Sequence, residues 1–154
     1  MIQRIQTLYL LIAAALLVVM LFVPLAWFAS EAGMFNLYAF SLQSADGSFA
    51  QSTVYLGILL VLSALLPLLT IFLYRRRLLQ IRLCVVEMVF LVGTVIMEAI
   101  YYFLSRRVFS ELALHNQGFK PAIVLPIVAL FFTFLAARAI FRDEMLVRSA
   151  DRIR

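Results

Sequence analysis

Charged residues are scarce in this sequence, and so are the side chains that hold metals. Of 154 residues, 14% are charged, and there is one cysteine and one histidine. Cys84 alone excludes an internal disulfide and any cysteine cluster for zinc or iron–sulfur ligation. His115 alone cannot supply a paired haem ligand. We therefore expect no cofactor and no metal site.

The common catalytic signatures are missing as well. The sequence contains no Walker loop, no G-x-G-x-x-G, no H-E-x-x-H and no C-x-x-C. His115 lies in a polar segment, where exposure is more common than catalysis. A non-enzymatic protein without catalytic residues is the expectation.

Hydrophobic residues are abundant: they make up 66% of the sequence, and the mean hydropathy is +1.06. Four apolar runs occupy about 8–29, 53–74, 83–104 and 121–141. Each is close to the length of about 20 residues that a helix needs to cross a bilayer. Helices are expected because each satisfies its own backbone hydrogen bonds in lipid. The pattern predicts an all-α, antiparallel four-helix transmembrane bundle in a single integral membrane domain, 1–154. The first run exceeds the h-region of a signal peptide and is interpreted as an anchor.

The basic residues predict how the bundle is oriented. The net charge of +5 would raise nucleic acid as a partner of a soluble protein, but here it indicates orientation and contact with anionic lipid, not nucleic acid. Placing both termini on the cytoplasmic side leaves only Arg106, Arg107 and Lys120 outside. The inner segments then hold Arg4, Arg75, Arg76, Arg77, Arg82, Arg138, Arg142, Arg148, Arg152 and Arg154. This is a positive-inside distribution.

The three longest segments outside the four runs carry further predictions. Residues 30–52 form the longest irregular piece, rich in aromatics, with a turn signal at Asp46-Gly47. The aromatics fit an interfacial belt, and a small hairpin capping the bundle is the alternative. Residues 105–120 are expected to extend the third helix or to lie flat on the membrane, with a helix stop at 116–118 and Pro121 in a first helical turn. The cytoplasmic tail, about 142–154, is predicted to continue as a helix.

One helical face of the third run is polar. On a helix, six residues fall on it: Cys84, Glu87, Thr94, Glu98, Tyr102 and Ser105. The candidate intramembrane polar stripe within this face consists of Glu87, Thr94, Glu98 and Tyr102. A charged residue at the bilayer centre costs roughly 2.5–3.5 kcal/mol on insertion scales, so the stripe must face the bundle, a partner subunit or water.

The two glutamates differ in their surroundings. Glu87 lies near the cytoplasmic boundary, within reach of Arg138 or the basic link. Glu98 lies deeper and has no evident charged partner in the chain. Three interpretations stay open for Glu98: a residue that handles protons or cations, a hydrogen-bonded structural acid, or an acid that meets a cation from another subunit or ligand.

The link between the second and third runs is basic. Arg75, Arg76, Arg77 and Arg82 lie beside the inner leaflet. They form a candidate contact for an anionic lipid such as cardiolipin. Determination of topology alone is the simpler interpretation.

The two ends of the chain carry a family resemblance. The opening MIQRIQTLYL at residues 1–10 and the closing DEMLVRSADRIR at 143–154 resemble an uncharacterised four-span membrane family of Bacteroidota, domain of unknown function 4293. The resemblance covers essentially the whole chain. It implies a small inner-membrane protein with four helices and supplies no catalytic residues.

These features favour an accessory or scaffold subunit that contacts other membrane proteins or lipid, as a hetero- or homo-oligomer. The alternative is a small proton- or cation-coupled transporter or channel that acts as an oligomer through the intramembrane glutamates.

Overall fold

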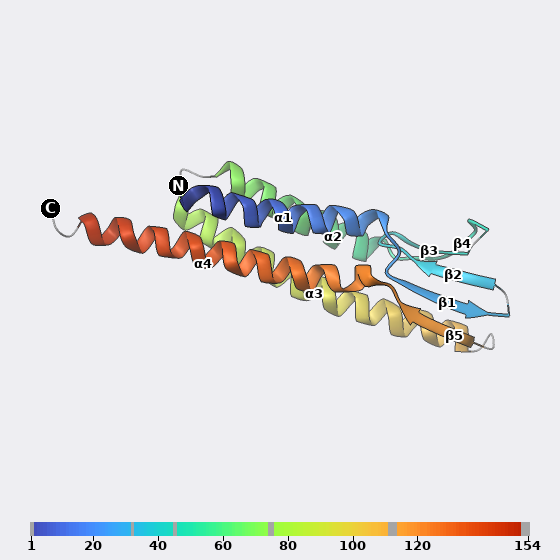
Figure 1. The fold of residues 1–154 in the computed structure, drawn as a ribbon. Coiled ribbons are helices and arrows are strands. Elements are labelled where there is room, and N and C mark those ends of the chain that lie inside the picture. The colour runs from blue at the N-terminus through green and yellow to red at the C-terminus, as the bar shows by residue number, and fades with distance from the viewer. Residues whose placement is uncertain (1, 32, 45, 74–75, 111–113, 152–154) are drawn as a thin grey trace.

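A computed structural model describes residues 2–31, 33–44, 46–73, 76–110 and 114–151, which form four long helices and a small sheet (Figure 1). The helices are α1 (Ile2–Phe22), α2 (Val54–Phe72), α3 (Arg77–Ser110) and α4 (Leu125–Asp151), and a 3-10 helix, η1 (Pro121–Val124), leads into α4. The strands are β1 (Ala26–Ser30), β2 (Gly33–Leu37), β3 (Ser41–Ser44), β4 (Phe49–Ser52) and β5 (Leu114–Phe119).

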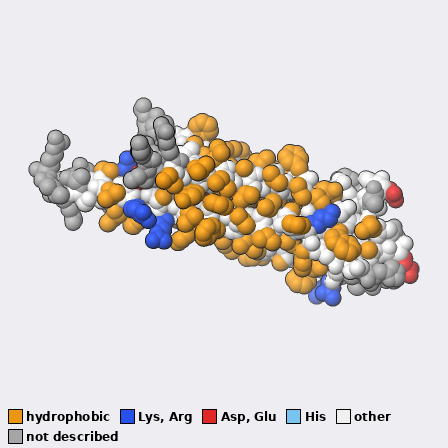
Figure 2. Space-filling model, viewed as in Figure 1, with side chains coloured by type: hydrophobic (Ala, Val, Ile, Leu, Met, Phe, Trp, Pro, Cys, Tyr) orange, Lys and Arg blue, Asp and Glu red, His pale blue; other side chains and the backbone are white. Residues whose placement is uncertain are grey.

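The helices form an antiparallel bundle in which each packs against two others. α1 contacts α2 and α4, and α3 contacts the same two helices, while the sheet caps one end and both chain termini lie at the other (Figure 1). All four helices are long and apolar enough to cross a membrane. Apolar side chains cover the middle of the visible face, with basic side chains at both margins (Figure 2). The predicted four-helix bundle is therefore confirmed.

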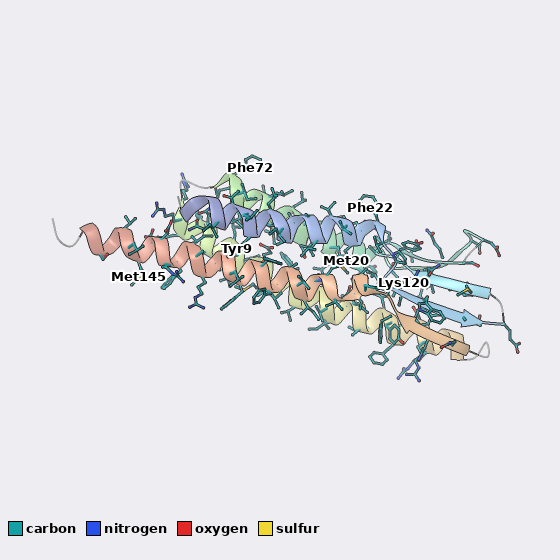
Figure 3. The ribbon with its side chains drawn as sticks, viewed as in Figure 1. Tyr9, Met20, Phe22, Phe72, Lys120 and Met145 are labelled. Atoms are coloured by element: carbon teal, nitrogen blue, oxygen red, sulfur yellow. The ribbon has the colours of Figure 1, made fainter. Side chains whose placement is uncertain are left out.

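The bundle core contains small and aliphatic side chains. Leu17 and Met20 of α1 are fully buried against Leu60 of α2 and Leu91 of α3. Tyr9 of α1 lies against Phe132 of α4, with ring centroids 6.1 Å apart (Figure 3). Phe22 and Phe72, at opposite ends of the bundle, point outward and are more than three-quarters exposed in the isolated chain (Figure 3). Aromatic and aliphatic side chains turned outward are what a lipid-facing surface requires.

The all-α prediction is wrong in one respect, because the chain also builds a five-stranded antiparallel sheet. The strand order is β4-β3-β2-β1-β5, so the predicted irregular segment 30–52 supplies most of the sheet. The turn signal at Asp46-Gly47 is confirmed, since Gly47 has φ +79° and its N–H donates to the Ser44 carbonyl at 2.9 Å. The hairpin alternative was closer to the structure than a simple aromatic belt.

The first apolar run ends earlier than predicted. α1 stops at Phe22, and Ala26–Ser30 is a strand although it belongs to the predicted span 8–29. Pro24 explains the break, because a proline disfavours helical geometry at the residue before it and donates no hydrogen bond. Hydropathy alone does not distinguish an apolar strand from the last turns of an apolar helix.

The segment between α3 and α4 also departs from the prediction. α3 does extend past the predicted span, to Ser110, but residues 116–118 lie within β5 and do not end a helix. Pro121 is the first residue of η1, as its position predicted. α4 then continues without interruption to Asp151, which confirms the helical tail as far as the structure describes it.

The sheet rests on the end of α3. Phe28, Leu37 and Leu42 on its inner face are buried together with Tyr102 of α3. The Tyr102 ring lies 5.4 Å from that of Phe28 and 4.3 Å from that of Phe119, measured between centroids. Tyr102 therefore fixes β1 and β5 to the bundle.

Candidate functional site

The polar face of α3 points into the protein. All six side chains of the predicted face are buried: Cys84, Glu87, Thr94, Glu98, Tyr102 and Ser105. Their placement follows from helical periodicity, since steps of three, four and seven residues return to one side of a helix. The structure thus buries the whole candidate stripe within the chain, but its members do different things.

Glu87 has a hydroxyl partner across the helix interface. Its side chain is fully buried, and the Thr133 hydroxyl of α4 donates to its Oε1 at 2.8 Å. The same hydroxyl lies 3.0 Å from the Ala129 carbonyl oxygen. The sequence suggested Arg138 as a partner, but that side chain is exposed and the bond is made one turn or so deeper in α4.

The geometry around Thr133 favours a neutral Glu87. A threonine hydroxyl carries one hydrogen, so it cannot donate fully to both acceptors. If Glu87 carries the proton, its O–H donates to Thr133 Oγ1 and the threonine donates to Ala129, which satisfies all three groups. Oε2 of Glu87 is buried and has no hydrogen-bond partner in the described part of the chain, which a protonated carboxyl tolerates better than a carboxylate.

Glu98 has no such partner. Its side chain is 3% exposed, and its buried Oε1 accepts no hydrogen bond from any residue that the structure describes. It lines a cavity of about 260 Å³ between α3 and the β5–η1–α4 segment. The remaining lining residues are apolar or aromatic: Val95, Ala99, Tyr102, Phe103, Phe119, Ile123, Val124 and Ile127.

This Glu98 pocket opens on the outside of the bundle. Phe103, Phe119 and Ile127, which form part of its wall, are each more than half exposed in the isolated chain. α3 is about 50 Å long, and Glu98 lies roughly 12 Å before Arg106 by helical rise, within the apolar span. The pocket is therefore accessible from the side, in the half of the span nearer the sheet.

The two acids are separated by packed residues. By helical rise they lie about 16 Å apart, and Leu91 and Thr94 between them are fully buried. The Thr94 hydroxyl donates to the Phe90 carbonyl of its own helix at 2.9 Å. The predicted stripe is thus two separate environments, a closed one at Glu87 and an open one at Glu98.

The basic candidates lie at the opposite end from the sheet. Arg76 and Arg82 are exposed, and Arg77 is half-buried, with its Nη1 donating to the Asp143 carbonyl at 3.5 Å. Arg75 and the His115 side chain lie outside the described residues. Among the residues that the structure describes, no three His, Cys, Asp or Glu side chains gather where a metal ion would fit.

The comparison with protein families covers nearly the whole chain. The model of the family described as domain of unknown function (DUF4293) matches residues 2–153. The chain belongs to this family. No curated protein matches it significantly. The resemblance noted at the two ends of the sequence is thereby confirmed.

In this DUF4293 member, sequence reasoning found the polar wall of the Glu98 pocket and missed the apolar one. Phe119 comes from the segment 105–120, whose fold was predicted incorrectly, and Ile123 and Ile127 lie at the start of the predicted fourth run. One signal was available: Pro121 as a helix start places the residues just after it at one end of the fourth span, the end near which Glu98 lies on the third. Nothing in the sequence pattern singled out Thr133 as the partner of Glu87.

Proposed function

We propose that this protein is a non-enzymatic accessory subunit of the bacterial inner membrane. Its Glu98 pocket accepts a hydrogen-bond donor or cation from a transmembrane segment of another membrane protein. One observation carries the proposal: Glu98, whose buried Oε1 has no hydrogen-bond partner among the described residues, lines an apolar pocket that opens on the side of the bundle. Such a group costs free energy in the isolated chain, and a partner that supplies a donor recovers it.

The orientation proposed from the sequence fits this function. The helix ends that carry the predicted inner arginines lie together with both termini (Figure 1). The excess of basic residues at that end supports a cytoplasmic location for it. The sheet and the Glu98 pocket are then on the periplasmic side.

Transport through both glutamates has less support. The cavity at Glu98 does not include Glu87, and buried Leu91 and Thr94 separate the two acids. Packed side chains fill the interior of the four-helix bundle. Among the described residues, no polar path joins the two acids. If wild-type protein in proteoliposomes supports a flux that is lost in Glu98→Gln, the transporter is favoured instead.

A stability measurement tests the central observation. We expect Glu98→Leu to leave the purified chain as stable as wild type or more stable, because it removes a buried carboxyl whose Oε1 has no hydrogen-bond partner among the described residues. Glu87→Leu is the matched control: it removes the hydrogen bond with Thr133 and should lower stability. Thermal unfolding in mild detergent reports both. A clear loss of stability in Glu98→Leu would show a structural acid and contradict the proposal.

Binding is tested by photocrosslinking in the membrane. A photoreactive residue at Ala99, on the pocket wall, should give a discrete adduct with another membrane protein, and the adduct should disappear in Glu98→Leu. The same photoreactive residue at Ile58, which is half exposed on α2, controls for random collision. An adduct of twice the chain mass would indicate a homo-oligomer, and adducts indifferent to Glu98 would rule out the pocket as the docking site.

A further inference from the structure

The basic end of the bundle contains a second, unrelated cavity. Its volume is about 610 Å³, and it lies between the start of α3 and the distal part of α4. Arg76, Arg77 and Arg82 line it from the α3 side, and Glu144 and Val147 line it from α4. Three arginines and one glutamate therefore contribute to the lining of this cavity.

The positive end of α3 strengthens the attraction for an anion. α3 begins at Arg77, and the N–H groups of Leu79 and Gln80 in its first turn donate to the Arg76 carbonyl. The positive end of the helix dipole therefore lies at Arg77 and Leu78, which line the cavity. Arg77 uses one N–H on the Asp143 carbonyl, and a guanidinium has five in all. Arginine donors in this planar arrangement match the oxygens of a phosphate.

An apolar groove continues from this cavity toward the membrane. A smaller cavity, of about 220 Å³, shares Leu78, Arg82 and Glu144 with the first. Its other lining residues, Ile81, Phe141 and Met145, include positions further along α3 and earlier in α4, which is the direction of the bilayer. Met145 marks this end of α4 in Figure 3.

From these two cavities we infer that the protein binds an anionic phospholipid. The phosphate group lies among Arg76, Arg77 and Arg82, and one acyl chain lies along the Leu78–Ile81–Phe141–Met145 groove. A free phosphate would occupy only the larger cavity, which the arginines line, whereas an amphipathic ligand fills both cavities. The site is at the end of the molecule opposite the Glu98 pocket and is independent of the function proposed for it.

The test compares lipids on the purified full-length protein in detergent. We expect phosphatidylglycerol to raise the unfolding temperature in a saturable manner, because a ligand that binds only the folded state stabilises it. Phosphatidylcholine, which carries no net charge, and inorganic phosphate at equal concentration should have much smaller effects. Equal stabilisation by phosphatidylcholine would overturn the inference, and equal stabilisation by inorganic phosphate would show a free-phosphate site instead.

A pair of double variants locates the binding. Arg76→Gln with Arg82→Gln should weaken phosphatidylglycerol binding on the order of tenfold or more, since each arginine near a membrane surface contributes about 1 kcal/mol. The control, Arg138→Gln with Arg142→Gln, removes the same charge from exposed positions at the same end that do not line the cavity. Equal weakening by both pairs would indicate general charge attraction and overturn the assigned site. The lipid comparison on the wild type decides the question even where a variant fails to fold.

Discussion

At the scale of single residues, the contact between Glu87 and Thr133 joins α3 to α4. Thr133→Val keeps the shape and removes the hydroxyl, which leaves Glu87 Oε1 without its hydrogen-bond partner. We expect unfolding in detergent to become easier by about 0.5–2 kcal/mol, the range of interhelical hydrogen bonds in membranes. Thr133→Ser retains the hydroxyl and should lose less. Equal losses in both variants would point to the methyl group and its packing instead.

A second contact at this scale joins Trp27 and Gly118, which are directly opposite each other on β1 and β5. A Cβ added to Gly118 would lie 2.6 Å from Trp27 Nε1, so Gly118→Ala must displace the indole. We expect a loss of about 1–3 kcal/mol from overpacking and a shifted fluorescence spectrum. Trp27 is the only tryptophan, so the signal is unambiguous.

Gly93→Ala is the control for that variant. A Cβ there meets only Leu59 Cδ2, at 3.7 Å, which is an ordinary contact. Alanine also favours a helix more than glycine does. The fluorescence and stability should therefore stay close to wild type. An unchanged spectrum in Gly118→Ala would mean that the indole does not lie over β5.

At the scale of elements, crosslinking tests the strand order of the sheet. Asn36 of β2 and Gln43 of β3 are directly opposite and half-buried. Replacing both with cysteine should give a disulfide on mild oxidation, visible as faster migration without reductant, since paired residues on adjacent strands lie within bonding range. Cysteines at Asn36 and Gln51 are the control, because β3 separates their strands. A bond in the control and none in the pair would contradict the strand order.

At the scale of the whole molecule, the orientation makes opposite predictions for the two ends. Asp46 in the β3–β4 turn and Ser149 near the end of α4 are both exposed, and native Cys84 is buried. A membrane-impermeant maleimide should label Asp46→Cys in intact spheroplasts and Ser149→Cys only after lysis, because the basic end is placed inside. The reverse pattern would invert the topology.

The sequence by itself determined the elements that depend on local order. Apolar runs of about 20 residues specify spanning helices, since no other regular structure satisfies its own backbone in lipid. The spacing from Cys84 to Ser105 placed six polar side chains on one face because helical periodicity is a property of a single element. The continuing helix of the tail was predictable for the same reason.

Tertiary structure alone decided which distant segments meet. β1 and β5 pair although more than eighty residues separate them. Strands of five and six residues carry too little sequence signal to specify which strand they pair with. That pairing brings Phe119 beside Tyr102 and carries the chain into η1, which closes the apolar wall opposite Glu98. Glu87 and Glu98 are equivalent in sequence pattern. Only the packing of α4 and β5 gives the first a hydroxyl and leaves the second facing an open pocket.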